Sequence, residues 1–332
     1  MTKKISQSEK KQKGSSGSKS KFDVISVGSA TVDCFVSLPV DFTHIKHGSK
    51  LLIENIHMTT GGGGTNVAVG MSRMGLKTGF IGEVGEDLSA HMIKHDLERE
   101  GVDFLVKQHS RHQTAYSVVL EARGKDRAIL VYKGASSYLE PDEIPKRLST
   151  GWFYFASVVG TSFKTMEHVA AFAKKSDIKV YFNPSSYMTE QGYDYLKKVI
   201  SATTIISLNK EEAQTLLNVQ TNNFLELLRG LHKLGPEVCI ITDGSNGAYA
   251  YDGTLHYFKK VRKMQAVDTT GAGDAFGAGF LSGFIMKGNL PLDKRIRFAM
   301  DMGMRNAESV IMFVGAKKGL LTKKKALELV GD

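Results

Sequence analysis

Short apolar runs alternate with amphipathic segments along most of this chain. The run from Phe22 to Gly28 is almost wholly apolar and ends in glycine, which is typical of a buried strand. Further strands are expected at residues 78–81, 153–156, 180–182, 204–208 and 238–242. Apolar residues recur with helical spacing between them, at 66–74, 90–100, 164–174, 210–217 and 224–234. This alternation predicts an α/β fold in which helices flank both faces of a central, mostly parallel sheet.

Two stretches depart from this alternation, at residues 40–60 and 108–136. Polar and apolar residues alternate in both, and a Gly-Lys-Asp turn at 124–126 separates two such runs in the second stretch. We expect antiparallel hairpins beside the main sheet. The sequence therefore predicts a small β-sheet lid on a body that extends over residues 22–332.

The positive charge of the chain is concentrated at its start. The formal net charge of the 332 residues is +10. Residues 1–21 hold seven lysines and one glutamate, a net charge of +6, so +4 is left for residues 22–332. This tail has too little apolar surface to offset the entropy of ordering and is predicted to be disordered. Because no aromatic residues interleave with its lysines, a solubilising extension fits it better than a nucleic-acid contact.

Cysteine usage and hydropathy bear on the cellular compartment. Cys34 and Cys239 lie far apart in apolar runs and indicate neither a disulfide framework nor a metal ribbon, which is typical of a reducing compartment. The longest uncharged apolar stretch, 275–286, is too short to cross a bilayer. We therefore expect a cytoplasmic protein without membrane contact.

Four consecutive glycines at 61–64 precede Thr65, Asn66 and a helical pattern. Glycine lets the backbone approach a ligand closely, and the following helix begins with free N–H groups. A flexible turn before a helix would look the same, so this motif alone does not decide the function.

A second glycine motif carries clearer chemistry. Residues 268–274 read Asp-Thr-Thr-Gly-Ala-Gly-Asp and open another helical pattern. Backbone amides that enter a helix form an anion pocket, and Asp274 beside it can take a proton from a hydroxyl. This pairing is the logic of phosphoryl transfer to an alcohol. The chain has neither a GxxxxGK[ST] loop nor a GxGxxG after its first strand, which argues against a Walker-type ATPase and a dehydrogenase.

At these residues the chain resembles the ribokinase-like family of carbohydrate and nucleoside kinases, also called the PfkB family. Both signature regions are present, at 61–66 and 268–274, and further matching positions follow in the family's order up to about residue 321. The resemblance implies a ribokinase-like fold with a lid and ATP-dependent transfer of the γ-phosphate to a substrate hydroxyl. A non-catalytic sugar or nucleotide sensor would be expected to lose Asp274 or a glycine of the second motif, and neither is lost.

The resemblance also implies a role for each matching residue. The general base is expected to be Asp274, with anion-hole amides from Gly271, Ala272 and Gly273. Substrate contacts are expected from Asp33, Gly62, Gly63 and Asn66. Nucleotide contacts are expected from Asn183, Asn209, Thr242, Gly244 and Gly247. Magnesium (Mg²⁺) is expected to be held through water by Asn209 and Glu212, which also fit the start of an ordinary helix, and the candidate ligands of a monovalent cation such as K⁺ are Asp268 and Thr270.

The acceptor is left open between a sugar, which we favour, and a nucleoside. Ribokinases usually carry a lysine where Gly63 stands here, so a hexose or a pentose other than ribose fits better than ribose. A nucleoside would need apolar surface for its base, for which Phe42, Met58 and Tyr116 in the lid segments are the candidates. Since the lids of relatives often pair, the resemblance also implies a homodimer.

Overall fold

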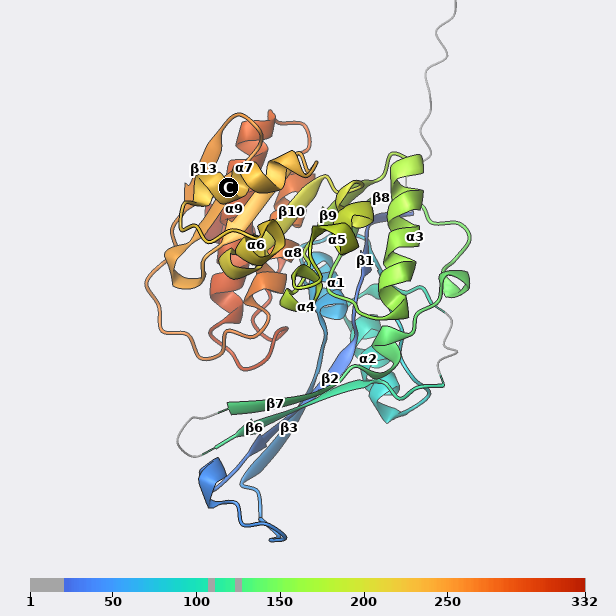
Figure 1. The fold of residues 1–332 in the computed structure, drawn as a ribbon, viewed down its shortest axis with the longest axis vertical. Helices are drawn as coiled ribbons and strands as arrows, with labels where there is room; N and C mark the ends of the chain where they lie inside the picture. Colours follow the sequence, from blue (N-terminus) through green and yellow to red (C-terminus); the bar gives the residue numbers. More distant parts are fainter. Residues whose placement is uncertain (1–20, 107–110, 123–126, 332) are drawn as a thin grey trace, which may run out of the picture.

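The computed structural model describes residues 21–106, 111–122 and 127–331. A nine-stranded sheet forms the body, in the order β13-β12-β11-β10-β9-β8-β1-β4-β5 (Figure 1). Seven neighbouring strands are parallel, and β12 and β13 continue the sheet antiparallel at one edge. The strands are β1 (Phe22–Val27), β4 (Thr78–Ile81), β5 (Val102–Phe104), β8 (Thr150–Phe155), β9 (Lys179–Phe182), β10 (Ile205–Asn209), β11 (Val238–Thr242), β12 (Ala248–Tyr251) and β13 (His256–Lys259).

Helices cover both faces of this sheet, as the alternation of the sequence predicts. The helices are α1 (Gly63–Arg73), α2 (Leu88–Arg99), α3 (Thr161–Lys175), α4 (Ser186–Thr189), α5 (Tyr193–Ile200), α6 (Lys210–Leu217), α7 (Phe224–Lys233), α8 (Ala272–Met286), α9 (Leu292–Val310) and α10 (Lys323–Val330). One apolar core joins sheet residues to α3, α5, α6 and α7, and a second joins them to α1, α8 and α9. Short 3-10 turns lie at η1 (Phe42–His44), η2 (Gly134–Ser137), η3 (Pro141–Glu143) and η4 (Gly244–Asn246).

The lid is a second sheet of four strands that projects from one end of the body (Figure 1). Its order is β3 (Asn55–Gly61), β2 (Thr31–Ser37), β6 (Ala115–Glu121) and β7 (Arg127–Tyr132). The pairs β2–β3 and β6–β7 are antiparallel hairpins, as predicted, and β2 runs parallel to β6 between them. The lid begins earlier than the predicted segment 40–60, because β2 at 31–37 belongs to it and residues 38–54 contain only the turn η1.

The described residues also bear on two further expectations. None of their helices combines the length and apolarity needed to cross a membrane. The predicted disordered tail, apart from Lys21, lies outside the described residues and stays a prediction.

Candidate active site

Two helix N-termini and the carboxyl ends of several parallel strands meet at one cavity of about 230 Å³. Carboxyl ends of parallel strands share one edge of a sheet, so residues far apart in sequence come together there. The cavity is lined by Gly63, Ser157, Asn183, Pro184, Ser185, Ser207, Asn209, Glu212, Thr242, Gly271, Gly273 and Asp274.

Asp274 lies in the first turn of α8 and faces this cavity. Burial and, to a lesser extent, the nearby Glu212 raise the pKa of its carboxyl to about 6. A hydrogen bond from Nδ2 of Asn66 to Oδ2 of Asp274, at 2.9 Å, and the charge of Lys317 act in the opposite direction. Asp274 is therefore a carboxylate whose pKa lies close to the physiological range, which suits a general base.

The N-terminus of α8 is built on a glycine in the left-handed conformation. Gly271 caps the helix at φ +76°, and a Cβ atom there would come within 2.4 Å of the Ala316 Cβ. In the part of the chain that the structure describes, the amides of Gly271 and Gly273 have no acceptor, whereas the Ala272 amide donates to Thr269 O at 3.2 Å. Two of the three predicted anion-hole amides are therefore free, and that of Ala272 is engaged.

Asn209 and Glu212 form a reciprocal cap at the start of α6. The Glu212 amide donates to Asn209 Oδ1 at 2.7 Å, and the Asn209 amide donates to Glu212 Oε2 at 2.9 Å. Burial raises the pKa of Glu212, although the hydrogen bond from Asn209 lowers it. The expected helix cap is confirmed, and the same two residues line the cavity that holds Asp274. Their expected role in holding Mg²⁺ stays a prediction.

A second, largely apolar cavity of about 490 Å³ adjoins the first at Thr242 and Gly273. Gly244, Gly247 and Ala272 line it, and the expected contact of Gly244 and Gly247 with the nucleotide stays a prediction. Gly247 has φ +129°, and a Cβ there would come within 2.2 Å of Lys259 O, so only glycine fits. Sequence reasoning missed its apolar walls, which come from Val261, Met264, Phe276, Met304 and Ile311.

Asn183 lines the first cavity and also holds the sheet together. Its Nδ2 donates to Ser207 O at 2.7 Å and so links β9 to β10. The hydroxyl of Thr242 lies 3.5 Å from Leu208 O, between β10 and β11. These two predicted nucleotide residues therefore stand at the strand ends that form the floor of the cavity.

Asp33 projects from the lid strand β2, which pairs with Thr59 of β3 and Ser117 of β6 at this position. Burial raises the pKa of Asp33, and the Ser117 hydroxyl and the charge of Lys317 partly offset this. A Cβ on Gly61 would lie 2.1 Å from Asp33 Oδ2, so the glycine makes room for the carboxylate. The lid thus carries a buried acid held by polar neighbours.

The glycine motif of the first signature brings Asn66 to Asp274, but not every predicted residue lines the cavity. Gly62 has φ +94°, and a Cβ there would come within 2.6 Å of Ser29 O, so it shapes the turn before α1. Gly63 lines the cavity, whereas Gly62 and Asp33 do not. Gly62 therefore shapes the turn, and Gly63 forms part of the cavity wall.

The lid side chains considered for a nucleoside base point away from Asp33. Cross-strand partners lie on one face, and successive residues alternate between faces. Tyr116 pairs with Val32 and Met58 pairs with Cys34, so both lie on the face opposite to Asp33. Phe42 lies in the turn η1, outside the strands. None of the three lines either cavity, and Asp33 does not line them either, so the cavity linings alone do not decide between a sugar and a nucleoside.

Comparison with known proteins identifies the family. The model of the pfkB family carbohydrate kinases matches residues 21–310. A Haemophilus influenzae ribokinase is 28% identical over 312 residues, which cover 92% of this chain and 97% of the relative. The chain belongs to the PfkB family of carbohydrate kinases. It is a sugar or nucleoside kinase that transfers a phosphoryl group to an alcohol.

Solved structures share the PfkB fold with this chain. A ribokinase from Giardia lamblia superposes with a TM-score of 0.80 at 20% identity, covering 94% of this chain and 99% of that one. An adenosine kinase from Sinorhizobium meliloti superposes with a TM-score of 0.78 at 22% identity, covering 93% and 99%. At these identities the likeness establishes the ribokinase fold and leaves the acceptor open.

Asp268, the first residue of the second PfkB signature, is buried and fully engaged. Its Oδ1 accepts from the amide and the hydroxyl of Thr270 at 3.0 and 2.7 Å, and its Oδ2 accepts from the Gly315 amide at 3.0 Å. Nη1 of Arg127, at the start of the lid strand β7, lies 3.3 Å from Oδ1. Burial acts to raise the pKa of Asp268, but these hydrogen bonds bring it below its usual value.

A guanidinium therefore already supplies positive charge where a monovalent cation was predicted. Both carboxylate oxygens of Asp268 accept protein hydrogen bonds, and a cation bound there would add to the positive charge that Arg127 already places beside Oδ1. Among the described residues, no group of three or more His, Cys, Asp or Glu side chains could hold a metal ion by itself. The donor set at Asp268 fits a lid contact better than K⁺, and K⁺ binding stays a prediction.

Proposed function

We propose that this protein transfers the γ-phosphate of ATP to a hydroxyl group of a sugar. The observation that carries the proposal is the placement of Asp274, held by Asn66, in one cavity with the free amides of Gly271 and Gly273. A base and an anion pocket at one point are what in-line phosphoryl transfer to an alcohol requires.

In this mechanism Asp274 takes the proton of the acceptor hydroxyl through Oδ1, because Oδ2 accepts from Asn66. The amides of Gly271 and Gly273 and the dipole of α8 stabilise the charge on the transferred phosphoryl group. ATP lies with its phosphates over Asn183, Asn209 and Thr242, and its base enters the apolar cavity beyond Gly244 and Gly247.

Mg²⁺ fits the chemistry of this cavity as a partner of the phosphates. It prefers oxygen ligands, keeps several waters and needs one or two carboxylates beside the substrate phosphates. Glu212, whose Oε1 accepts from the Ser186 hydroxyl at 3.3 Å, is the carboxylate placed to hold it through water, together with Asn209. When bound, the ion neutralises charge on the phosphates.

Polar side chains on the Asp33 face of the lid favour a sugar as the acceptor. Thr59 and Ser117 flank Asp33 across the sheet, with Val131 next to Ser117 in the same row, and the hydroxyl and carboxylate groups beside Asp33 suit a polyol. The aromatic Tyr116 and the apolar Met58 lie on the opposite face, where they offer nothing to a base in the site. We therefore place the acceptor between this lid face and Asp274.

We also propose that two lids pair in a homodimer and that the enzyme works in the cytoplasm. Ile56, Met58, Ile129 and Leu130 of the lid strands are 41–59% exposed, which is unusual for large apolar side chains grouped on one small sheet. Pairing of two lids would cover them. Size measurements of the full chain test this proposal, and a monomer at micromolar concentration would contradict it.

A coupled ADP-release assay with Mg-ATP tests the kinase reaction. The panel contains pentoses, hexoses, phosphosugars and nucleosides, and each is run with Asp274→Asn and with Asp194→Asn. Asp194 is a matched control because it lies in the first turn of α5 and its side chain is exposed. Turnover of a sugar that only Asp274→Asn abolishes is expected. Turnover of nucleosides alone would contradict the choice of a sugar, and no turnover with ATP bound would contradict catalysis.

A further inference from the structure

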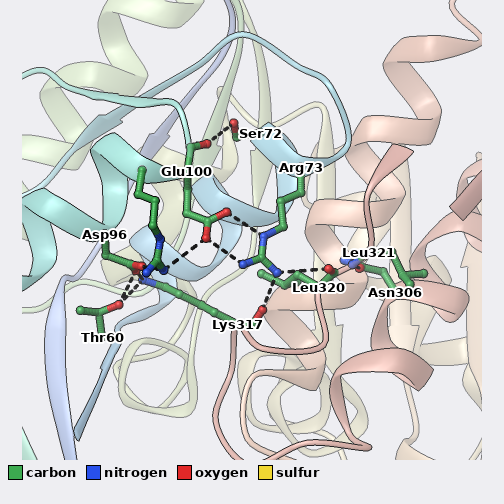
Figure 2. A network of polar contacts seen from close by, with 10 residues as sticks. Thr60, Ser72, Arg73, Asp96, Glu100, Asn306, Lys317, Leu320 and Leu321 are labelled. Carbon is green, nitrogen blue, oxygen red and sulfur yellow. Dashed lines mark hydrogen bonds and ion pairs between the residues drawn. The ribbon is translucent and has the colours of Figure 1, made fainter. Parts of the chain in front are cut away.

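Residues 311–321, which connect α9 to α10, form a strap whose far end is clamped by Arg73 of α1 (Figure 2). Nη1 of Arg73 donates to the carbonyl oxygens of Lys317 and Leu320 at 2.9 and 3.2 Å. Its Nε and Nη2 each donate to Glu100 at 2.8 Å. The strap is therefore held by a guanidinium whose three nitrogen atoms all donate hydrogen bonds.

The near end of this strap lies against the proposed anion hole. The Gly315 amide donates to Asp268, and Ala316 packs so closely on Gly271 that no side chain fits there. The strap is thus in direct contact with the residues at the N-terminus of α8.

Lys317 joins the strap to the lid and to α2 (Figure 2). Its Nζ lies 2.9 Å from Thr60 Oγ1 on β3 and 3.0 Å from Asp96 Oδ2 on α2. The side chains of Lys317 and Asp96 are only 11% and 14% exposed. Burial lowers the pKa of Lys317, and Asp96 partly restores it. The buried ion pair therefore joins the strap to α2, and the hydrogen bond from Lys317 to Thr60 joins the strap to the lid strand β3.

A separate cavity of about 480 Å³ lies on the outer side of this connection, between β3, α2 and the strap. It shares no lining residue with the two cavities described above, although Thr59, which flanks Asp33 on the lid, also lines it. Asp96 is its single acidic lining residue among those described. Its basic lining residues are His57, Arg73, His95, Arg99, Lys317 and Lys318.

The positive charge around this cavity exceeds what its acids neutralise. Four lining side chains are cationic, namely Arg73, Arg99, Lys317 and Lys318, and one, Asp96, is anionic. Glu100 lies outside the lining but pairs with Arg73 and Arg99, so an excess of two positive charges remains. The whole of residues 22–332 has a net charge of only +4. In the described chain Lys318 and His95 have no hydrogen-bond or ion-pair partner, and Lys318 lies over the Phe313 ring at 5.8 Å. The cavity therefore carries a local excess of two positive charges.

The chemistry of the walls indicates what such a site would take. Arginine and lysine donors around a concave surface suit a phosphate group, which accepts several N–H bonds at once. The partly exposed Met58, Met92 and Val314 add apolar surface to the same cavity. A volume of this size lies in the usual range of small-molecule sites. Side chains that donate hydrogen bonds to a phosphate, next to an apolar wall, fit an organic phosphate better than inorganic phosphate.

We propose that this cavity binds a small phosphate ester as a regulatory ligand, separate from ATP and from the acceptor. Bound between Arg99, Lys318 and Lys317, the phosphate joins α2 to the strap and stabilises the contact of Lys317 with the lid strand. The ligand should therefore lower the KM for the acceptor, by roughly fivefold or more for an ordinary coupling between sites. This effect on KM rests on the proposed kinase function, whereas binding itself does not.

Calorimetric titration of the full chain tests the binding. The protein is first saturated with a non-hydrolysable ATP analogue and Mg²⁺, so that phosphate positions in the active site are filled. The probes are glycerol 3-phosphate, inorganic phosphate and glycerol. The cavity variant is Arg99→Met/Lys318→Met, and the matched control is Lys174→Met/Lys175→Met, which removes two exposed charges from α3.

The expected result is binding of glycerol 3-phosphate that is at least tenfold weaker in the cavity variant and unchanged in the control. No binding to the wild type at millimolar concentration would overturn the proposal. Equal losses in both double variants would reduce it to a general charge effect and overturn it too. Binding of inorganic phosphate with exclusion of the ester would overturn the choice of ligand. Because these titrations need no turnover, their outcome can be distinguished from a failure of the kinase assay.

Discussion

The side-chain amide of Asn66 donates from Nδ2 to Oδ2 of Asp274 across 2.9 Å, although 208 positions separate the two residues. Asn66 belongs to the first turns of α1 and Asp274 to the first turn of α8, so two helix N-termini converge on one carboxylate. The contact leaves Oδ1 on the side of Gly63, where a glycine Cβ would lie 3.6 Å from it. Asp274 therefore has one oxygen held in place and one open to the cavity.

Asp274→Asn should abolish phosphoryl transfer and leave ATP binding nearly intact. Asparagine keeps the shape of the side chain but cannot accept a proton from the acceptor, and loss of a general base costs about 10²- to 10⁴-fold in rate. Steady-state kcat and the dissociation constant of ATP measure the two effects. A variant that retains more than a few per cent of kcat would show that Asp274 is not the base.

The rate should fall on the acid side of about pH 6. Burial raises the pKa of Asp274 to about 6, and only the ionised carboxylate can act as a base, so kcat should fall tenfold per pH unit below that value. The hydrogen bond from Asn66 lowers this pKa. Asn66→Ala should therefore move the acid limb to higher pH. A limb near pH 4 in the wild type, or no movement in the variant, would contradict this assignment.

The strands and helices of the body could be predicted because their apolar residues, which face the core, recur with the spacing of a strand or a helix. The runs at 78–81 and 238–242 are mostly apolar, and they match β4 and β11 residue for residue. The lid strand β2 was missed because Thr31–Ser37 follows a glycine turn and mixes polar with apolar residues. The strands β12 and β13 at one end of the sheet were also missed, and each has only four residues.

The candidate site was predictable where it depends on unusual residue types. Glycines and acids at fixed spacing located Gly271, Asp274, Asn209 and Glu212, which all line one cavity. Apolar residues of a ligand cavity and of the core look alike in sequence, so Met264 gave no signal. Contacts between distant segments leave no spacing to detect, and for this reason the pairs of Lys317 with Asp96 and with Thr60 appear only in the structure.

Gly271→Ala should lower both stability and activity. The left-handed conformation at φ +76° costs an alanine roughly 1–2 kcal/mol, and its Cβ would clash with Ala316 and displace the strap or α8. We expect the melting temperature to fall by several degrees and kcat to fall at least tenfold. Gly192→Ala is the matched control, since Gly192 caps α5 at φ +79° with nothing within 4 Å of a Cβ. Equal effects of the two substitutions would show that the contact with Ala316 does not matter.

Arg127→Met should loosen the lid and create a demand for a cation at Asp268. Nη1 of Arg127 contacts Asp268, and Nη2 lies 2.9 Å from Glu121 across the hairpin, so one guanidinium links the lid to the loop before the anion hole. Its removal leaves a buried carboxylate without a counter-charge. We expect a severalfold higher KM for the acceptor, with kcat changed less.

Melting temperatures in KCl and in choline chloride at equal ionic strength separate the lid contact from a cation site. The wild type should melt at the same temperature in both salts, because Arg127 already supplies the charge that Asp268 requires. Arg127→Met should gain stability specifically in KCl, whereas Arg229→Met, an exposed position on α7, should behave as the wild type. Stabilisation of the wild type by K⁺ would instead support the cation site expected from the sequence. In that case K⁺ would have to bind beside Arg127 or replace it, because both neutralise the same carboxylate.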